Sequence, residues 1–383
     1  LSAEAAAAMA PKGRRHGIDW LLVAAVTLAA VGLGWLIVAL PLLDGTPNWA
    51  QDFIAYQSAG QRLVESGTLY SQLSLRGPFE PLAQNLYLYP PHLGIAMAPM
   101  AGMSAQDGAT AWYLLHVALL ALACGLMPVR LRTRLLVLGM GALSYGVIRD
   151  LTMGNVSVLL LLPLVVGWRW LDRPVGSVAL AMAASVRVFF SVYLLWFAVR
   201  RAWRPLLWMA GGGLALWLLS LQFVGLEGYR DYFTMIGNIS GMSDLVQNRH
   251  LTFTLIRLGI PVEHAWLALV PIVALALGTV VVSRRRDPPL GYMVTAAAGI
   301  LLAPLMWDHY LSVLLLTAAF LTDRGRPWAV AVPLLMWLPH ELQPFAAIAA
   351  LFLPFLARDA AATDADVPSA TPASVPEQAP AHG

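Results

Sequence analysis

The stretch IDWLLVAAVTLAAVGLGWLIVALPLL at residues 18–43 decides the class of fold. A transmembrane α-helix needs about 20 consecutive apolar residues, and the apolar core of a signal peptide is shorter than this run. No clear small-residue cleavage site follows it. We therefore predict that the run is a retained membrane-spanning helix.

Basic residues in front of this run set its orientation. They are Lys12, Arg14, Arg15 and His16. Positively charged residues gather on the cytoplasmic side of spanning helices. The N-terminal segment 1–17 is therefore expected in the cytoplasm, and the chain from Asp44 onward, including Asp52, is expected on the extracytoplasmic side.

The composition extends this interpretation to the whole chain. Of 383 residues, 59% are hydrophobic and only 12% are charged, whereas about a quarter of the residues of a soluble domain are charged. Lipid takes the place of the missing polar surface, and the fold is predicted to be an all-α, polytopic helical bundle. The single cysteine, Cys124, lies in an apolar run and excludes a disulfide framework and a cysteine metal site.

The remaining basic residues form clusters that are predicted to mark cytoplasmic turns. These clusters are Arg130/Arg132/Arg134, Arg169/Arg173, Arg200/Arg201/Arg204, Arg284/Arg285/Arg286, Arg324/Arg326 and Arg358. Between them we predict about twelve crossings with both termini inside the cell. After the first span these are about 108–128, 135–149, 155–171, 174–187, 189–199, 206–224, 265–283, 289–305, 309–322, 327–340 and 342–357.

Three kinds of region follow from this pattern. The cytoplasmic tail 1–17 precedes a transmembrane domain at 18–357, and the polar tail 358–383 is expected to be disordered and cytoplasmic. Long extracytoplasmic loops are predicted at 44–106 and 225–264, the first carrying interfacial helices. The short pair of spans meeting at Arg187 is interpreted as a helical hairpin, with one continuous helix as the alternative.

Several short motifs then resemble glycosyltransferase family 87, a member of the GT-C superfamily of membrane transferases. They are QDFIAYQSAGQRLVESGTLY (51–70), YLYPPH (87–92), GN (154–155), SVRVFFSVYLLWFAVRRAWR (185–204) and WDHYLSVLL (307–315). The resemblance runs from about residue 18 to about residue 330, and it rests on the order and spacing of these motifs.

The resemblance implies a membrane enzyme that moves a sugar, commonly mannose, from a polyprenyl-phosphate carrier to a glycan or glycolipid acceptor outside the cytoplasm. It implies a bacterial-type inner membrane, no cofactor, and no nucleic-acid partner. In the family the acid of the D-F-x-x-Y motif is the catalytic base, which is Asp52 here. The chain departs where a lysine followed by prolines is expected, because it has Arg187, Val188 and Phe189.

The chemistry of the residues agrees with this role for Asp52. On a helix, Tyr56 lies one turn after Asp52, and Ala59 or Gly60 follows on the same face, which suggests a surface of small residues open to substrate. One carboxylate is sufficient for an inverting displacement, because it accepts the proton of the attacking hydroxyl. The alternative is a solvent-facing acid at the start of a helix.

Charge on the leaving phosphate must be met by cations, since the first loop has no cluster of metal-ligand spacing. Arg187, Arg149 and His309 are the candidates, and guanidinium groups match phosphate geometry. Alternatives are a buried ion pair for Arg187, a pair with Asp150 or with a neighbouring loop for Arg149, and simple packing for His309. Tyr56 is a further candidate for binding the donor phosphate or sugar. Weaker candidates for binding acceptor or donor are His340, Arg249, His250 and His92.

Two other functions stay open at this stage. A lipid or solute transporter, such as a flippase, is also a polytopic bundle with arginines at membrane depth. However, transporters concentrate polar sites near the midplane, whereas polar residues here gather in the outer loops and at outer span ends. The substitution of the expected lysine also leaves open a noncatalytic assembly partner with a degenerate site.

Overall fold

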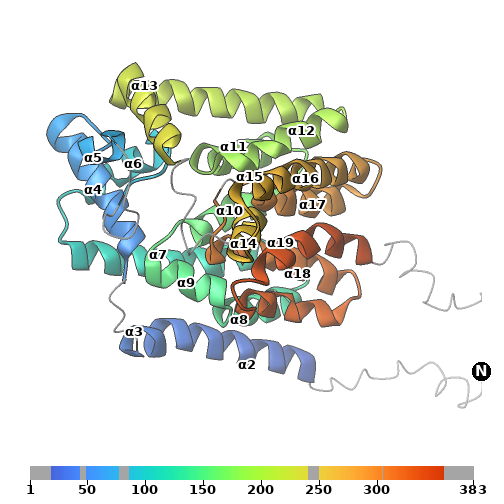
Figure 1. Cartoon of the computed structure of the whole chain (residues 1–383). Coiled ribbons are helices and arrows are strands. Elements are labelled where there is room, and N and C mark those ends of the chain that lie inside the picture. The colour runs from blue at the N-terminus through green and yellow to red at the C-terminus, as the bar shows by residue number, and fades with distance from the viewer. Residues whose placement is uncertain (1–18, 44–48, 77–85, 240–249, 304, 358–383) are drawn as a thin grey trace, which may run out of the picture.

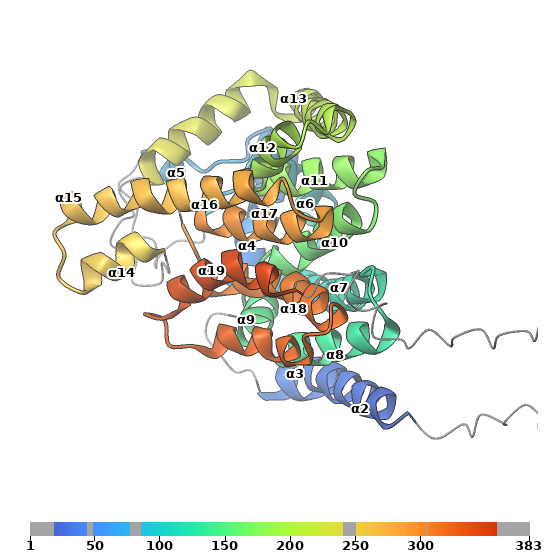
Figure 2. The ribbon, with the colours of Figure 1, turned by 90° about the vertical axis from the view of Figure 1, so that its right-hand side faces the viewer.

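The computed structural model describes residues 19–43, 49–76, 86–239, 250–303 and 305–357. Within these ranges every regular element is a helix, which confirms the all-α class (Figure 1). The predicted tails 1–17 and 358–383 lie outside the described residues. Figures 1 and 2 place α2 and α13 at opposite edges of the bundle, with the other helices between them.

The N-terminal part contains the first apolar run and the first outer loop. Its elements are α2 (Trp20–Gly34), a π-helical turn η1 (Trp35–Ala39), α3 (Leu40–Leu43), α4 (Gln51–Ser66), α5 (Gln72–Arg76), α6 (Pro91–Met97), η2 (Ala98–Met100) and α7 (Ala105–Leu126).

The central part follows as α8 (Leu131–Ala142), α9 (Tyr145–Met153), α10 (Ser157–Arg169), α11 (Pro174–Val186), η3 (Val188–Ser191), α12 (Val192–Val199) and α13 (Trp203–Ile239). The C-terminal part consists of α14 (Leu251–Arg257), α15 (Val262–Ala265), η5 (Trp266–Ala268), α16 (Leu269–Ser283), α17 (Pro288–Leu301), η6 (Asp308–Val313), α18 (Leu314–Asp323), η7 (Pro327–Trp337), α19 (Gln343–Phe352) and η8 (Leu353–Leu356).

The first apolar run forms a helix long enough to cross a membrane, as predicted. Apolar helix extends over Trp20–Leu42, and the side chain of Asp19 caps its start by accepting from the backbone N–H groups of Leu21 and Leu22. The run packs against α8 through glycines: a Cβ on Gly139 would come within 2.7 Å of the Leu28 backbone. Small residues allow this close approach of two helices, as is common between transmembrane helices.

The predicted number of about twelve crossings is not confirmed. Among the described residues, three helices are long and apolar enough to span, Trp20–Leu42, Ala105–Leu126 and Trp203–Asn238. A fourth is possible if α8 and α9, which meet at a bend of 61°, are counted as one span. The other apolar helices are shorter, and several adjoin 3₁₀ turns. Such irregular backbone is tolerated within a membrane where other parts of the protein surround it.

The chain breaks at Arg187, as the hairpin interpretation predicted. Helix α11 ends at Val186, and Arg187 has an extended backbone with φ −128° and ψ 98° before η3 begins. One continuous helix is therefore excluded.

The chain breaks at Gly225, where the second outer loop was predicted to begin, and the segment that follows is helical. Gly225 has a non-helical backbone with φ 61° and ψ −172°, which separates two helices within α13, and the second of them runs to Ile239. The amide of Asn238 then donates to the carbonyl of Leu75 at 3.0 Å. The second half of α13 therefore covers the helices of the first outer loop, which gather on the left of Figure 1.

The first outer loop folds around α4, the helix on which Asp52 and Tyr56 were expected to lie one turn apart. A Cβ on Gly60 would come within 2.8 Å of the Met97 carbonyl, and Ala59 is fully buried. The small residues of α4 therefore serve close packing of α4 on α6. The expectation that they form a surface open to substrate was wrong.

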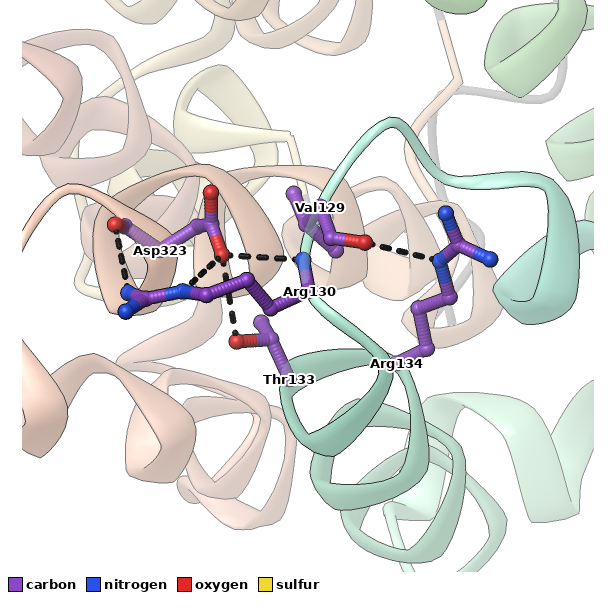
Figure 3. A network of polar contacts seen from close by, with 5 residues as sticks. All are labelled: Val129, Arg130, Thr133, Arg134 and Asp323. Carbon is purple, nitrogen blue, oxygen red and sulfur yellow. Dashed lines mark hydrogen bonds and ion pairs between the residues drawn. The ribbon is translucent and has the colours of Figure 1, made fainter. Parts of the chain in front are cut away.

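Several of the predicted cytoplasmic turns meet at one end of the bundle. Arg130 pairs with Asp323 at 2.9 Å, and Arg134 donates to the Val129 carbonyl (Figure 3). A cavity of about 170 Å³ beside them is lined by Pro128, Val129, Trp168, Pro289, Phe320, Asp323 and Arg324. The segments near residues 130, 169, 287 and 324 therefore lie together.

Candidate functional site

Asp52 lies in the first turn of α4, at the point where this helix contacts α9. The helix begins after Ala50, whose left-handed backbone (φ 55°) lets its N–H donate to the Thr152 carbonyl at 2.7 Å. The carboxylate of Asp52 accepts a hydrogen bond from the Asn155 amide, with 2.6 Å between Nδ2 and Oδ2. The alternative of an acid that merely faces solvent at a helix start is therefore wrong.

Asn155 lies in a short turn between α9 and α10. Gly154 ends α9 with a positive φ of 69°, and the N–H of Asn155 donates to the Asp150 carbonyl at 2.8 Å. The Asn155 side-chain oxygen accepts from Arg187 Nη2 at 2.6 Å. One amide thus connects Asp52 with Arg187, although the two residues are far apart in sequence.

Arg187 is almost completely buried and is held on two sides by tyrosines. Its guanidinium lies over the ring of Tyr310 at 3.8 Å and donates to the hydroxyl of Tyr89 at 3.4 Å. Within the described part of the chain it forms no ion pair with a carboxylate, and its Nε has no hydrogen-bond partner. The predicted alternative of a buried ion pair is therefore not what the structure contains.

Arg149 belongs to the same site. The positive charges of Arg149 and Arg187 both interact electrostatically with Asp52 and with His309. The alternative pairing with Asp150 is wrong, because the Asp150 carboxylate accepts from the N–H groups of Ser157 and Val158 at 2.8 and 3.1 Å. Asp150 therefore caps α10 and leaves Arg149 to the site.

His309 lies in η6, buried beside Tyr310 with 5.1 Å between the ring centroids. Its Nε2 atom has no hydrogen-bond partner among the described residues. A buried polar atom without a partner is costly and often marks a ligand position. Two arginine charges and this open nitrogen together form a site suited to an anion.

Tyr56 completes the wall beside Asp52. Its ring is buried and meets the ring of Tyr89 edge-on at a centroid distance of 5.1 Å. Tyr87 and Trp112 pack against it at 6.4 Å each. Tyr56 is thus placed next to the acid as predicted, within a rigid aromatic wall.

The electrostatic setting of Asp52 makes its carboxylate a better proton acceptor than an exposed one. Burial raises the pKa of Asp52 above its ordinary value near 3.8. The hydrogen bond from Asn155 and the charges of Arg187 and Arg149 lower this pKa and partly offset the effect of burial. The carboxylate is therefore a stronger proton acceptor than an exposed aspartate.

The weaker candidates make contacts elsewhere. His250 caps α14 by accepting from the Thr252 N–H at 3.3 Å, and His340 lies 3.7 Å from Asp308. His92 lies beside Tyr229 with 3.5 Å between its Nε2 and the tyrosine hydroxyl. Arg249 lies outside the described residues. None of these described contacts joins the Asp52 site.

Three residues of the site received no role from the sequence: Asn155, Tyr89 and Tyr310. The signal for Asn155 was present in the GN pair, a polar side chain following a glycine between apolar runs. Tyr89 and Tyr310 belong to motifs that were noticed, but their contacts depend on segments far apart in the chain. No three His, Cys, Asp or Glu side chains of the described residues could jointly hold a metal ion.

The chain is similar to known proteins in two comparisons. The model of glycosyltransferase family 87 matches residues 87–307, more than half of the chain. A polyprenol-phosphate-mannose-dependent alpha-(1-2)-phosphatidylinositol mannoside mannosyltransferase of Mycolicibacterium smegmatis is 24% identical over 379 residues, covering 85% of this chain and 83% of that protein. No solved structure matches the chain.

Proposed function

The chain belongs to glycosyltransferase family 87, and we propose that it transfers a hexose, in the first instance mannose, from a polyprenyl-monophosphate carrier to an extracytoplasmic acceptor. The carrier and the sugar are supported by the printed name of the mycobacterial relative. The acceptor class that fits is a glycan or glycolipid, and the membrane is a bacterial-type inner membrane.

The observation that carries this proposal is the short chain of contacts from Asp52 through Asn155 to Arg187. A carboxylate and a guanidinium lie on either side of one amide, without forming a direct ion pair. An acid and a cation arranged in this way can act on opposite ends of one displacement reaction.

In the proposed reaction the acceptor hydroxyl attacks the anomeric carbon of the sugar. The Asp52 carboxylate accepts the hydroxyl proton while the bond between the anomeric carbon and the phosphate oxygen breaks, and the polyprenyl phosphate leaves with the electron pair. A single displacement inverts the anomeric configuration. Inversion needs one carboxylate as base, and Asp52 is the residue that we propose for it.

Charge on the departing phosphate is met by Arg187, Arg149 and His309. Arg187 offers its unpartnered Nε, and His309 its unpartnered Nε2. Charge-assisted hydrogen bonds to phosphate strengthen as negative charge develops in the transition state. Tyr310 and Tyr89 hold the guanidinium, so an arginine can fill this place although the family pattern leads one to expect lysine.

The two rival functions are less well supported. Membership of a glycosyltransferase family argues against a transporter or flippase. A degenerate, noncatalytic partner is disfavoured because a buried arginine without a carboxylate partner is costly to retain, and it is explained most simply by an anionic substrate.

The experiment is to incubate membranes carrying the protein with a panel of radiolabelled polyprenyl-phosphate sugars and a lipid extract as acceptor. Matched membranes carrying Asp52→Asn serve as the control. The proposal expects protein-dependent transfer from the mannose carrier, and about 10²-fold less or lower still in the control membranes. No transfer from any carrier in the panel, or equal transfer by both membranes, would contradict it.

A further inference from the structure

We propose that Asn155 is a positioning residue that holds Asp52 and Arg187 in register, so that one side-chain amide sets the distance between the proton acceptor and the phosphate-binding cation. This inference rests on the proposed function. It assigns a role to a residue for which the sequence motifs gave none.

The amide of Asn155 can face only one way. Its Oδ1 accepts from Arg187 Nη2 at 2.6 Å and from the Val156 N–H at 2.7 Å, and both of these groups are donors only. Its Nδ2 donates to Asp52 Oδ2 at 2.6 Å, and a carboxylate only accepts. Exchanging the oxygen and nitrogen would place donor against donor and oxygen against oxygen.

The backbone that carries Asn155 is fixed from several sides. The indole Nε1 of Trp112 donates to the Gly154 carbonyl at 2.9 Å, and the Asp150 carboxylate caps the helix that follows. A Cβ on Gly154 would come within 2.7 Å of Phe53 Cβ, so the turn presses directly against α4. The turn therefore positions Asn155 and the helix of Asp52 together.

This arrangement leaves the reactive atoms available. Asn155 occupies Oδ2 of Asp52, and Oδ1 accepts no hydrogen bond from the described chain, so in the proposed reaction Oδ1 is the atom that accepts the proton. The amide also keeps the carboxylate and the guanidinium from pairing directly with each other. Both charges therefore remain available for substrate, at a spacing that the amide defines.

Only an amide satisfies both neighbours. Aspartate at position 155 would still accept from Arg187, but it would set two carboxylates against each other and disfavour the ionised form of Asp52. Leucine has a similar volume and would remove both hydrogen bonds. These two substitutions therefore separate the contact with Asp52 from the contact with Arg187.

The test compares wild type, Asn155→Leu and Asn155→Asp in purified form, with transfer measured over a range of pH. The titratable or charged groups acting on or with Asp52 are Tyr56 of α4, Arg149 of α9, Tyr310 of η6 and Arg187. They are unchanged in both variants.

We expect kcat to fall by about 10²-fold in Asn155→Leu, because the base is then no longer held in the geometry that the reaction needs. The acid limb of the pH profile should move to higher pH in Asn155→Leu, and it should move further in Asn155→Asp than in Asn155→Leu.

Gln57→Leu is the matched control. Gln57 is a buried amide on α4 that donates to the carbonyls of Met100 and Met103, away from Asp52. We expect this control to lower thermal stability while leaving the acid limb in place. If the Asn155 variants instead behave like the control, so that the acid limb of their pH profile is unchanged, Asn155 is merely structural and the inference is wrong.

A second measurement needs no substrate and separates this inference from the proposed function. The change in Tm caused by Asn155→Leu is measured in wild type and in an Asp52→Ala background. Coupled residues give different changes in the two backgrounds. Equal changes would overturn the positioning role even if the protein transfers mannose, whereas coupling without transfer would leave the contact intact and refute the proposed function alone.

Discussion

The guanidinium of Arg187 lies over the ring of Tyr310 at 3.8 Å, directly after the break between α11 and η3. Stacking on an aromatic ring fixes the plane of a guanidinium. The plane in turn fixes the direction in which Nε and the Nη atoms point. Arg187 is therefore presented to the site in one orientation.

This geometry leads to a prediction for donor use. Arg187→Met removes the charge and the contact with Asn155, and transfer should fall by about 10²-fold or more, with a weaker apparent affinity for the donor. Arg187→Lys should retain part of the activity, because an ammonium group keeps the charge but loses the stacked plane. Steady-state kinetics with the three proteins checks this order. Equal activity in all three would show that the arginine has no role in binding the donor.

The turn at Gly154 leads to a prediction for stability. Gly154→Ala adds a Cβ within 2.7 Å of Phe53 at a residue with φ 69°, so it should lower the free energy of unfolding by about 1–3 kcal/mol and reduce transfer. Gly125→Ala in α7 is the control, because no atom lies within 4 Å of its added Cβ. It should be neutral or slightly stabilising. Similar Tm values for both variants would refute the strain at Gly154.

The pKa of Asp52 leads to a prediction for pH dependence. The ionised carboxylate is the active form, and burial raises its pKa above the ordinary value near 3.8. Transfer should therefore fall as the pH is lowered through this raised pKa, before an exposed aspartate would be protonated. A profile of kcat/KM against pH measures this fall in activity at low pH. Full activity down to about pH 4 would contradict the assignment.

The same shift has a consequence for folding stability. A carboxyl group whose folded pKa lies above its unfolded pKa stabilises the fold most at low pH, and this contribution is lost as the pH rises through the folded pKa. Ionised Asp52 therefore costs stability at neutral pH.

Orientation in the membrane is a separate prediction. Cysteine in place of Glu65, which is exposed at the end of α4, should react with an impermeant thiol reagent on intact cells when Cys124 is replaced by alanine. Arg173→Cys, in a predicted cytoplasmic turn, should react only after permeabilisation. The reverse pattern would place the site on the cytoplasmic side and remove the proposed acceptor compartment.

Much of the fold was predictable where composition and local pattern determine structure. The apolar run before Asp44 predicted a spanning helix, and the periodic segment after Gln51 predicted α4 within a few residues. The break at Arg187 followed from two basic clusters too close for two full spans. The predicted span that ends at residue 224 is followed by a non-helical glycine, Gly225, because glycine adopts a positive φ at little cost.

Less of the site was predictable, for a physical reason. Asp52, Arg149, Arg187 and His309 stand out because a charged or titratable group is costly among apolar residues. Asn155 carries no charge, and its importance comes from partners that are 103 and 32 positions away in sequence. The wrong pairing of Arg149 with Asp150 came from adjacency in sequence, whereas the structure uses Asp150 as a helix cap.

The central claim is that Asp52 accepts the proton of the attacking hydroxyl. Asp52→Asn keeps the shape of the side chain but removes the proton acceptor, so kcat should fall by about 10²-fold or more. Because ionised Asp52 costs stability, Tm at neutral pH should not fall.

The most direct measurement compares transfer rate, donor affinity and Tm for purified wild type and Asp52→Asn in the same detergent. The account predicts lost turnover with retained donor binding and an undiminished Tm. A variant that keeps most of its transfer rate would show that the base lies elsewhere, and joint loss of donor binding and Tm would show that Asp52 is structural.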